Sequence, residues 1–208
     1  RRSSDLSGMA DEPKVLSLGA YGGMDFFTLK GTVEVILEGL RITDVRYEAE
    51  RENPSYHPGR CARVYSGETP LGVLGQVHPH VAGNYGADCE LYTAELWFDA
   101  LCQCAGGKPL YVPLPKFPAV TRDIALLCSR SIPVAALEDC IRRGAKGLLK
   151  NVALFDIYTG PGVPEDKKSA AFSLELRADD RSLTAEEADE DVKSILELLK
   201  TELDAVLR

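Results

Sequence analysis

The segment from Val152 to Leu176 constrains the fold of this chain more than any other stretch of the sequence. It reads VALFDIYTGPGVPEDKKSAAFSLEL, in which two runs of period-2 alternation are joined by a loop rich in glycine, proline and lysine. Because successive side chains of a strand point to opposite faces, this pattern predicts a β-hairpin. One face of the hairpin is expected to be apolar and the other mixed and polar.

Strict alternation predicts which side chains of the hairpin are buried. In its first strand, Phe155 and Ile157 are expected on the covered face. The opposite face then holds Val152, Leu154, Asp156 and Tyr158. In the second strand the covered residues are Phe172 and Leu174.

Segments on both sides of the hairpin complete a β-α-β-β-α-β order. A strand is predicted from Arg122 to Cys128 and a helix from Pro133 to Arg143, while a capping box at Thr184 begins a second, long helix. A last short strand is expected at 205–208. This order is that of the ferredoxin-like fold, in which both helices cover one face of the sheet. The open face is then expected to present Asp123, Ala125, Asp156, Tyr158, Ser169 and Ser173.

A second domain is predicted ahead of this one. Residues 106–120, GGKPLYVPLPKFPAV, hold two glycines and four prolines, a composition typical of a linker. The expected domains are therefore 1–112 and 113–208. In the first, a helix is predicted from Phe27 to Leu40, followed by short runs with turn residues between them that indicate antiparallel strands. The expected fold class is α+β in both domains.

The composition excludes several classes of protein. A net charge of −8 argues against binding of DNA or RNA by bulk electrostatics alone, although a local site is still possible. No apolar run is long enough to span a bilayer, and the first residues lack the pattern of a secretory signal, so we expect a cytoplasmic protein. The six cysteines are scattered through apolar contexts, which favours free thiols over disulfides or a metal site.

Several motifs resemble a known family. In the second domain, FPAVTRDIAL, LFDIYTG, KKSAAFSLEL, DRSLTAEE and the final LR resemble, in order and spacing, the ferredoxin-fold anticodon-binding domain of bacterial phenylalanyl-tRNA synthetase β subunits. In the first, FFTLKGTVE, YHPGRCARV and LGVLGQVHPHV are similar to the non-catalytic, class II synthetase-like module of the same subunit, which is expected to be incomplete here. The resemblance covers nearly the whole chain.

The resemblance implies a function and a set of site residues. It implies a fragment of phenylalanine–tRNA ligase that supports the α subunit of an α2β2 enzyme and binds the anticodon of tRNA(Phe). The anticodon contacts carry over to Ala125, Asp156, Tyr158 and Ser169. On charge alone, Lys167 and Lys168 are expected to contact phosphate. The holoenzyme is expected to use ATP and Mg²⁺, whereas no cofactor, metal or catalytic residue is expected in this chain.

Two alternatives stay open from the sequence. One is a freestanding RNA-binding or interaction module that reuses the same C-terminal fold. The other is a small metal- or phosphate-dependent enzyme centred on His57, Arg60, Cys61 and His78. The sequence offers no recognisable triad or metal-ligand spacing around these residues, and each histidine adjoins a proline in a turn.

Overall fold

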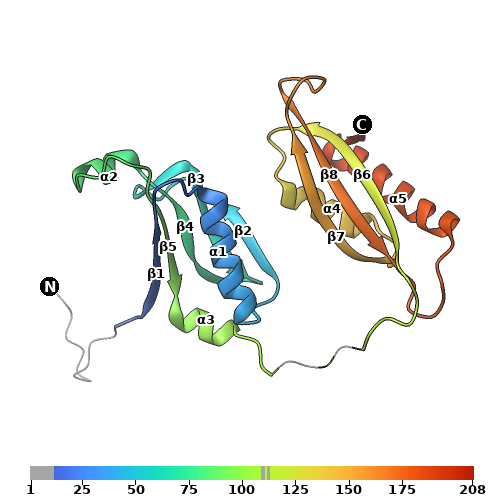
Figure 1. The fold of residues 1–208 in the computed structure, drawn as a ribbon, viewed down its shortest axis with the longest axis horizontal. Coiled ribbons are helices and arrows are strands. Elements are labelled where there is room, and N and C mark those ends of the chain that lie inside the picture. Colours follow the sequence, from blue (N-terminus) through green and yellow to red (C-terminus); the bar gives the residue numbers. More distant parts are fainter. Residues whose placement is uncertain (1–11, 109–110, 112) are drawn as a thin grey trace. The chain divides into compact units, whose positions relative to one another are not determined.

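The chain folds into two compact units. A computed structural model describes residues 12–108, 111 and 113–208, and contacts within the chain divide it into Arg1–Leu110 and Tyr111–Arg208 (Figure 1). Within the described residues, none of the helices combines the length and the apolar character that crossing a membrane requires.

Unit 1 is a five-stranded antiparallel sheet with order β1-β5-β4-β3-β2. Helix α1 packs on one face of it, where Leu29, Val33 and Leu37 join the buried side chains of the central strands. Spacings of four residues put these three leucine and valine side chains on a single stripe of the helix. The elements of this unit are β1 (Val15–Ala20), α1 (Phe26–Gly39), β2 (Val45–Ala49), β3 (Tyr56–Ser66), β4 (Thr69–Val77), α2 (Pro79–Asn84), β5 (Tyr92–Trp97) and α3 (Phe98–Cys104).

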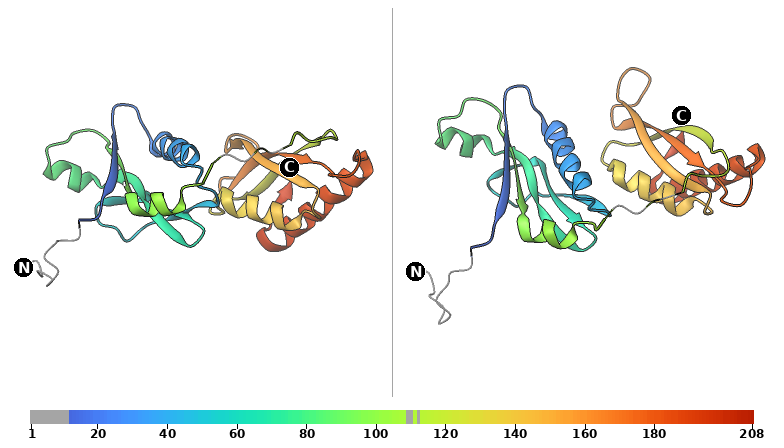
Figure 2. Two further views of the ribbon diagram at one scale, coloured as in Figure 1. Left: turned by 90° about the horizontal axis from the view of Figure 1, so that it is seen from below. Right: turned by 60° about the horizontal axis from the view of Figure 1, so that its bottom comes forward.

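Unit 2 has the predicted β-α-β-β-α-β order. Its four strands are antiparallel in the order β7-β8-β6-β9, and both helices lie on the same face of the sheet (Figure 2). The elements are β6 (Val120–Ser129), α4 (Val134–Gly144), β7 (Leu149–Tyr158), β8 (Lys167–Leu176), α5 (Ala185–Leu203) and β9 (Val206–Leu207). One core joins both helices to the sheet through fully buried side chains such as Leu126, Leu137, Phe172 and Ile195. The ferredoxin-like fold and the α+β class are therefore confirmed.

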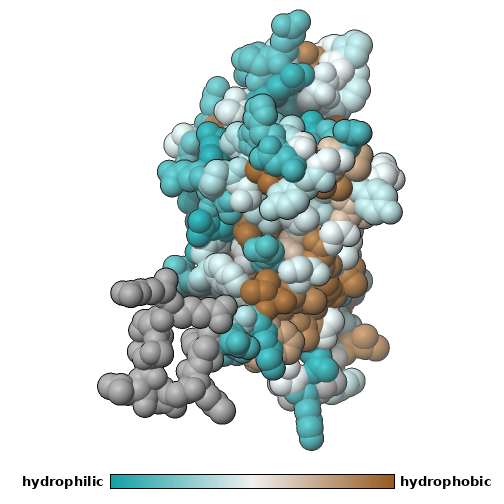
Figure 3. Space-filling model, turned by 90° about the vertical axis from the view of Figure 1, so that its left-hand side faces the viewer, coloured by the Kyte–Doolittle hydropathy of each residue, from teal (hydrophilic) through white to brown (hydrophobic). Residues whose placement is uncertain are grey.

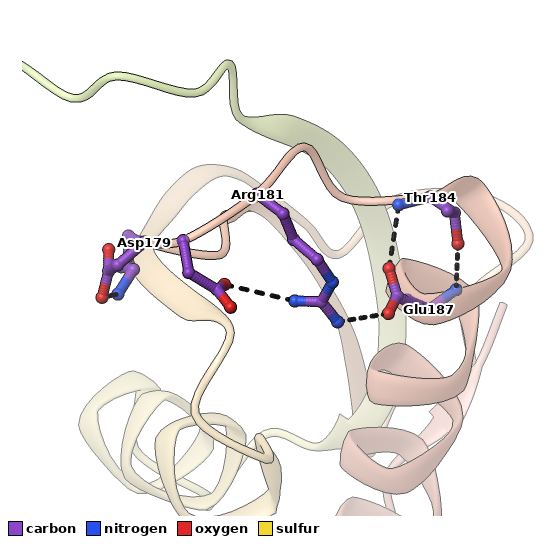
Figure 4. A network of polar contacts seen from close by, with 6 residues as sticks. Asp179, Arg181, Thr184 and Glu187 are labelled. Carbon is purple, nitrogen blue, oxygen red and sulfur yellow. Dashed lines mark hydrogen bonds and ion pairs between the residues drawn. The ribbon is translucent and has the colours of Figure 1, made fainter.

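The capping box predicted at the start of α5 is also confirmed (Figure 4). The Glu187 amide donates to the Thr184 hydroxyl at 3.3 Å, and the Glu187 carboxylate accepts from the Thr184 amide at 3.0 Å. Arg181 binds both Asp180 and Glu187. The Thr184 amide, followed by the Arg181 guanidinium, holds the pKa of Glu187 below its usual range. Glu187 thus satisfies a free amide at the start of the helix, where the helix dipole favours negative charge.

A β-bulge in β7 changes the face assignment of the hairpin. The pairing with β8 shifts between Leu154, which lies opposite Phe172, and Asp156, which lies opposite Ala171. Phe155 is the additional residue between them. Because two residues of a bulged strand oppose one residue of its partner, the alternation of faces is reversed beyond this point.

The bulge makes half of the predicted face assignment for β7 wrong. Val152 is 6% exposed and Leu154 packs against the core, although both were expected on the open face. Conversely, Phe155 was expected on the covered face, but it is the bulge residue and is 60% exposed. Ile157 lies opposite the buried Ala170 on the covered side, as expected, although it is 45% exposed there. Asp156 and Tyr158 still lie on the open face, because the bulge separates them from the two core residues that precede them.

We expect the two phenylalanines of this hairpin to differ in their contribution to stability. Phe172→Ala removes a fully buried ring and should lower the free energy of unfolding by about 3–5 kcal/mol. The matched variant Phe155→Ala should lower it by less than about 1 kcal/mol, because that ring is mostly exposed. Urea unfolding of both variants measures the difference, and equal losses would contradict the bulge.

Candidate nucleic-acid interface

The four residues assigned to the anticodon site lie on the open face of the unit 2 sheet, in two neighbouring rows. In the first row, Ala125 of β6 lies opposite Ala171 of β8, which lies opposite Asp156 of β7. In the second row, Ser169 of β8 lies opposite Tyr158 of β7. Rows on one face are about 7 Å apart and strands about 5 Å apart, so the four residues span an area that matches one or two nucleobases.

Tyr158 is held in place by the loop that follows it. Its hydroxyl donates to the carbonyl oxygen of Pro161 at 3.1 Å. Gly160 lies directly against the ring, so that a Cβ atom there would be 2.5 Å from the tyrosine oxygen. The loop therefore orients an aromatic ring on the open side of the sheet, as a stacking contact requires.

Asp156 and Ser169 offer hydrogen-bonding groups next to this ring, but they differ in exposure. Asp156 is exposed, and its carboxylate can accept hydrogen bonds from the edge of a base. Ser169 is only 4% exposed. Its hydroxyl becomes available to a ligand only when the side chains that cover it move aside.

The two lysines at the mouth of the hairpin lie on opposite faces of β8. Lys167 is partly exposed and lies opposite Ser129 on the open side. Lys168 lies opposite the buried Cys128, is 9% exposed, and donates from its ammonium group to the carbonyl oxygen of Ile132. The phosphate contact expected for Lys168 therefore has no support in this geometry, because the alternation that exposes one lysine buries the other.

Arg130 adds positive charge beside Lys167. Its guanidinium donates to the carbonyl oxygens of Lys167 at 3.2 Å and Thr159 at 3.5 Å, and so joins the two ends of the hairpin loop. Lys167 and Arg130 together give this end of the sheet a local positive charge, which suits a phosphate backbone.

Sequence reasoning missed several residues of the open face, and Phe155 and Arg208 are two of them. Phe155 was assigned to the core, since alternation cannot reveal a bulge. Arg208 was not assigned a role, although its guanidinium carbon lies 5.3 Å from the centroid of the Tyr158 ring. The strand predicted at 205–208 could have indicated this position, because alternation along a strand places Arg208 on the same face as Val206.

The residues of the alternative enzyme site in unit 1 make structural contacts. The Nδ1 atoms of His57 and His78 each accept a hydrogen bond from the backbone amide two residues further along. Arg60 binds Glu90 at 3.0 Å and Gln76 at 2.9 Å. Hydrogen bonds from Tyr92, then from Arg60, hold the pKa of Glu90 below its usual range.

Cys61 is likewise unsuited to chemistry at neutral pH. The residue is 6% exposed, and burial raises the pKa of its thiol to about 11. Since the thiolate is the reactive and metal-binding form, this cysteine stays protonated and inert. Across the described ranges, no three histidine, cysteine, aspartate or glutamate side chains gather as metal ligands do, and the cysteines there are free thiols.

Gly160→Ala should displace the Tyr158 ring. The new Cβ would lie 2.5 Å from the tyrosine oxygen and 2.6 Å from Cζ, so the ring must turn away and lose its bond to Pro161. We expect a cost of about 1 kcal/mol in unfolding free energy and altered NMR shifts of the Tyr158 ring protons. In the control Gly107→Ala, the new Cβ meets no atom within 4 Å. Unchanged ring shifts in Gly160→Ala would contradict the packing of Tyr158 against this loop.

Comparison with known proteins agrees with this architecture. A model of the phenylalanyl tRNA synthetase beta chain CLM domain matches residues 3–98, and a model of the ferredoxin-fold anticodon binding domain matches residues 115–208.

Curated relatives match over nearly the whole chain. The phenylalanine–tRNA ligase beta subunit of Clostridium tetani is 40% identical over 99% of this chain and 26% of its own length. That of Moorella thermoacetica is 41% identical over 90% of this chain and 23% of its own, and that of Bacillus subtilis 36% identical over 94% and 24%. The chain thus spans about a quarter of the length of the relatives it matches. With both domains of that subunit in order, the chain belongs to the phenylalanyl-tRNA synthetase beta subunit family.

Proposed function

We propose that unit 2 binds the anticodon of tRNA(Phe) on the open face of its sheet, as part of a phenylalanine–tRNA ligase. The observation that carries this proposal is the convergence of Ala125, Asp156, Tyr158 and Ser169 on the open side of a sheet whose other side is covered by two helices. Stacking on an aromatic ring with hydrogen bonds to base edges is the usual mode of recognising unpaired RNA bases.

The chemistry divides among these residues. Tyr158 stacks on a base, Asp156 accepts hydrogen bonds from exocyclic amines, and the Ser169 hydroxyl donates or accepts once it is uncovered. Ala125 and Ala171 leave space above the strands for the base to approach. Lys167 and Arg130 lie where the phosphate backbone can pass. The net charge of −8 makes this local positive charge important, because the chain as a whole repels RNA.

The whole ligase would join phenylalanine to tRNA with ATP and Mg²⁺ in its catalytic α subunit, within an α2β2 assembly in the cytoplasm. In this division of labour, the present chain binds RNA and supports the α subunit, and the chemistry takes place elsewhere. In unit 1, His57 and His78 accept hydrogen bonds within turns and Arg60 forms an ion pair with Glu90. These structural contacts fit a supporting role for that unit.

Exposed apolar side chains on unit 1 are consistent with subunit contact. On α1, Phe27 and Val35 are 74% and 68% exposed, on the side away from the buried stripe. The edge strand β1 adds Val15, its neighbour β5 adds Trp97, and α3 adds its first residue, Phe98. Hydrophobic side chains gather in part of the surface that Figure 3 shows. Apolar surface of this kind marks protein-binding sites in soluble proteins.

Tyr158→Ala should weaken RNA binding. Loss of one base stack costs about 1–3 kcal/mol, which is roughly a 5- to 150-fold rise in Kd. Fluorescence anisotropy with a stem-loop RNA that carries the anticodon complementary to a phenylalanine codon measures the change. Tyr85→Ala removes a tyrosine of unit 1 that is 87% exposed and should leave Kd unchanged. A folded Tyr158→Ala variant that keeps the wild-type Kd would refute the stacking role.

The double variant Phe27→Asp/Val35→Asp should abolish capture of a co-expressed α subunit, because it puts two charges into an apolar contact. Affinity purification followed by gel quantification of the α subunit gives the result. Tyr85→Asp serves as the control, since it adds a charge at an exposed aromatic residue outside α1. Full capture by the double variant would show that α1 is not the contact.

A further inference from the structure

Arg208 lies on the open face, in the same row as Ala125. Strand β9 pairs with β6, with Val206 opposite Leu127, and the Arg208 amide donates to the carbonyl oxygen of Ala125 at 2.8 Å. Leu127 is on the open side, so Val206 is as well, and the residue two positions on shares that side. The backbone bond to Ala125 anchors Arg208 there.

The Arg208 side chain runs across the sheet to reach Tyr158. The strand order β7-β8-β6-β9 puts Tyr158 and Arg208 at opposite edges, which are about 14 Å apart at the usual strand spacing. The guanidinium carbon nevertheless lies 5.3 Å from the centre of the tyrosine ring. The two side chains therefore meet above the central strands β8 and β6.

The residues beneath this contact allow it. The row that contains Arg208 continues through Ala125 and Ala171, whose methyl groups leave the space above the sheet free. In the neighbouring row, Ser169 lies opposite Tyr158 and is only 4% exposed. Small side chains of the sheet therefore lie beneath two planar groups, the phenol ring of Tyr158 and the guanidinium of Arg208.

We propose that Arg208 forms the second wall of the base-binding site, and that a nucleobase enters between the Tyr158 ring and the Arg208 guanidinium. This inference rests on the proposed anticodon-binding function. A planar guanidinium stacks on aromatic faces and also attracts the RNA backbone, which a neutral side chain does not.

The spacing fits a small rearrangement. A base between two planar groups needs about 7 Å between them, two stacking distances of about 3.4 Å. The present distance from the guanidinium carbon to the ring centre is 5.3 Å, so the guanidinium has to move by less than about 2 Å. The long side chain of an arginine that is anchored through its backbone can do so.

The test is a set of binding measurements with the 208-residue chain and the stem-loop RNA described above. Arg208→Ala should raise Kd by about 5-fold or more, the loss of one stacking partner. Arg208→Lys keeps the positive charge but lacks the planar guanidinium, and it should bind the RNA more weakly than wild type does. The control Arg142→Ala removes the same charge from the end of α4, on the helix side, and should bind as wild type does.

The double variant Tyr158→Ala/Arg208→Ala separates the possible outcomes. If the two residues enclose one base, their losses are coupled and the double variant binds little worse than the weaker single one. Wild-type or tighter binding by Arg208→Ala overturns the inference, and tighter binding would identify the guanidinium as a cover that excludes the base. If Tyr158→Ala also binds RNA as wild type does, the proposed anticodon-binding function is refuted. If Tyr158→Ala binds more weakly while Arg208→Ala does not, only the proposed role of Arg208 is refuted.

Discussion

The β-bulge at Phe155 is the feature on which the open face of unit 2 depends. On one side of it, Val152 and Leu154 point into the helix-covered core; on the other, Asp156 and Tyr158 point away from it. A regular strand would force these two pairs onto the same face. One additional residue thus lets β7 contribute both to the core and to a polar site.

The rest of the site follows from that reversal. Tyr158 reaches the open side next to Gly160, where the absence of a side chain accommodates its ring. The small side chains of Ala125 and Ala171 leave space above β6 and β8. The Arg208 side chain extends through this space from β9, at the edge of the sheet opposite Tyr158. The same alternation that presents Lys167 on this side buries Lys168 on the opposite, helix-covered side of the sheet. The charge at the site therefore depends on the position of each lysine in the strand and not on composition.

Both units share one structural plan, an antiparallel sheet with helices covering one face. In unit 1 the covering helix α1 keeps apolar residues on its outer side, and the histidines and Arg60 are occupied by turn and ion-pair contacts. In unit 2 the outer face of the sheet carries the potential ligand contacts. This difference is consistent with a division into protein contact and RNA contact along one chain.

The sequence by itself determined the order and type of the main elements. Period-2 and helical spacing, the capping box at Thr184 and the proline-rich segment are local signals, and they predicted the ferredoxin-like order and the open-face residues Ala125 and Ser169. The short helix α2 was not predicted, because its six residues are too few to show a period.

Only the tertiary structure decided the position of Phe155 and the roles of Lys168 and Arg208. A bulge is defined by pairing with another strand, the buried Lys168 binds a carbonyl oxygen of the turn before α4, and the contact between Arg208 and Tyr158 joins opposite edges of a sheet. These are interactions between segments distant in sequence, so alternation within one strand does not contain them.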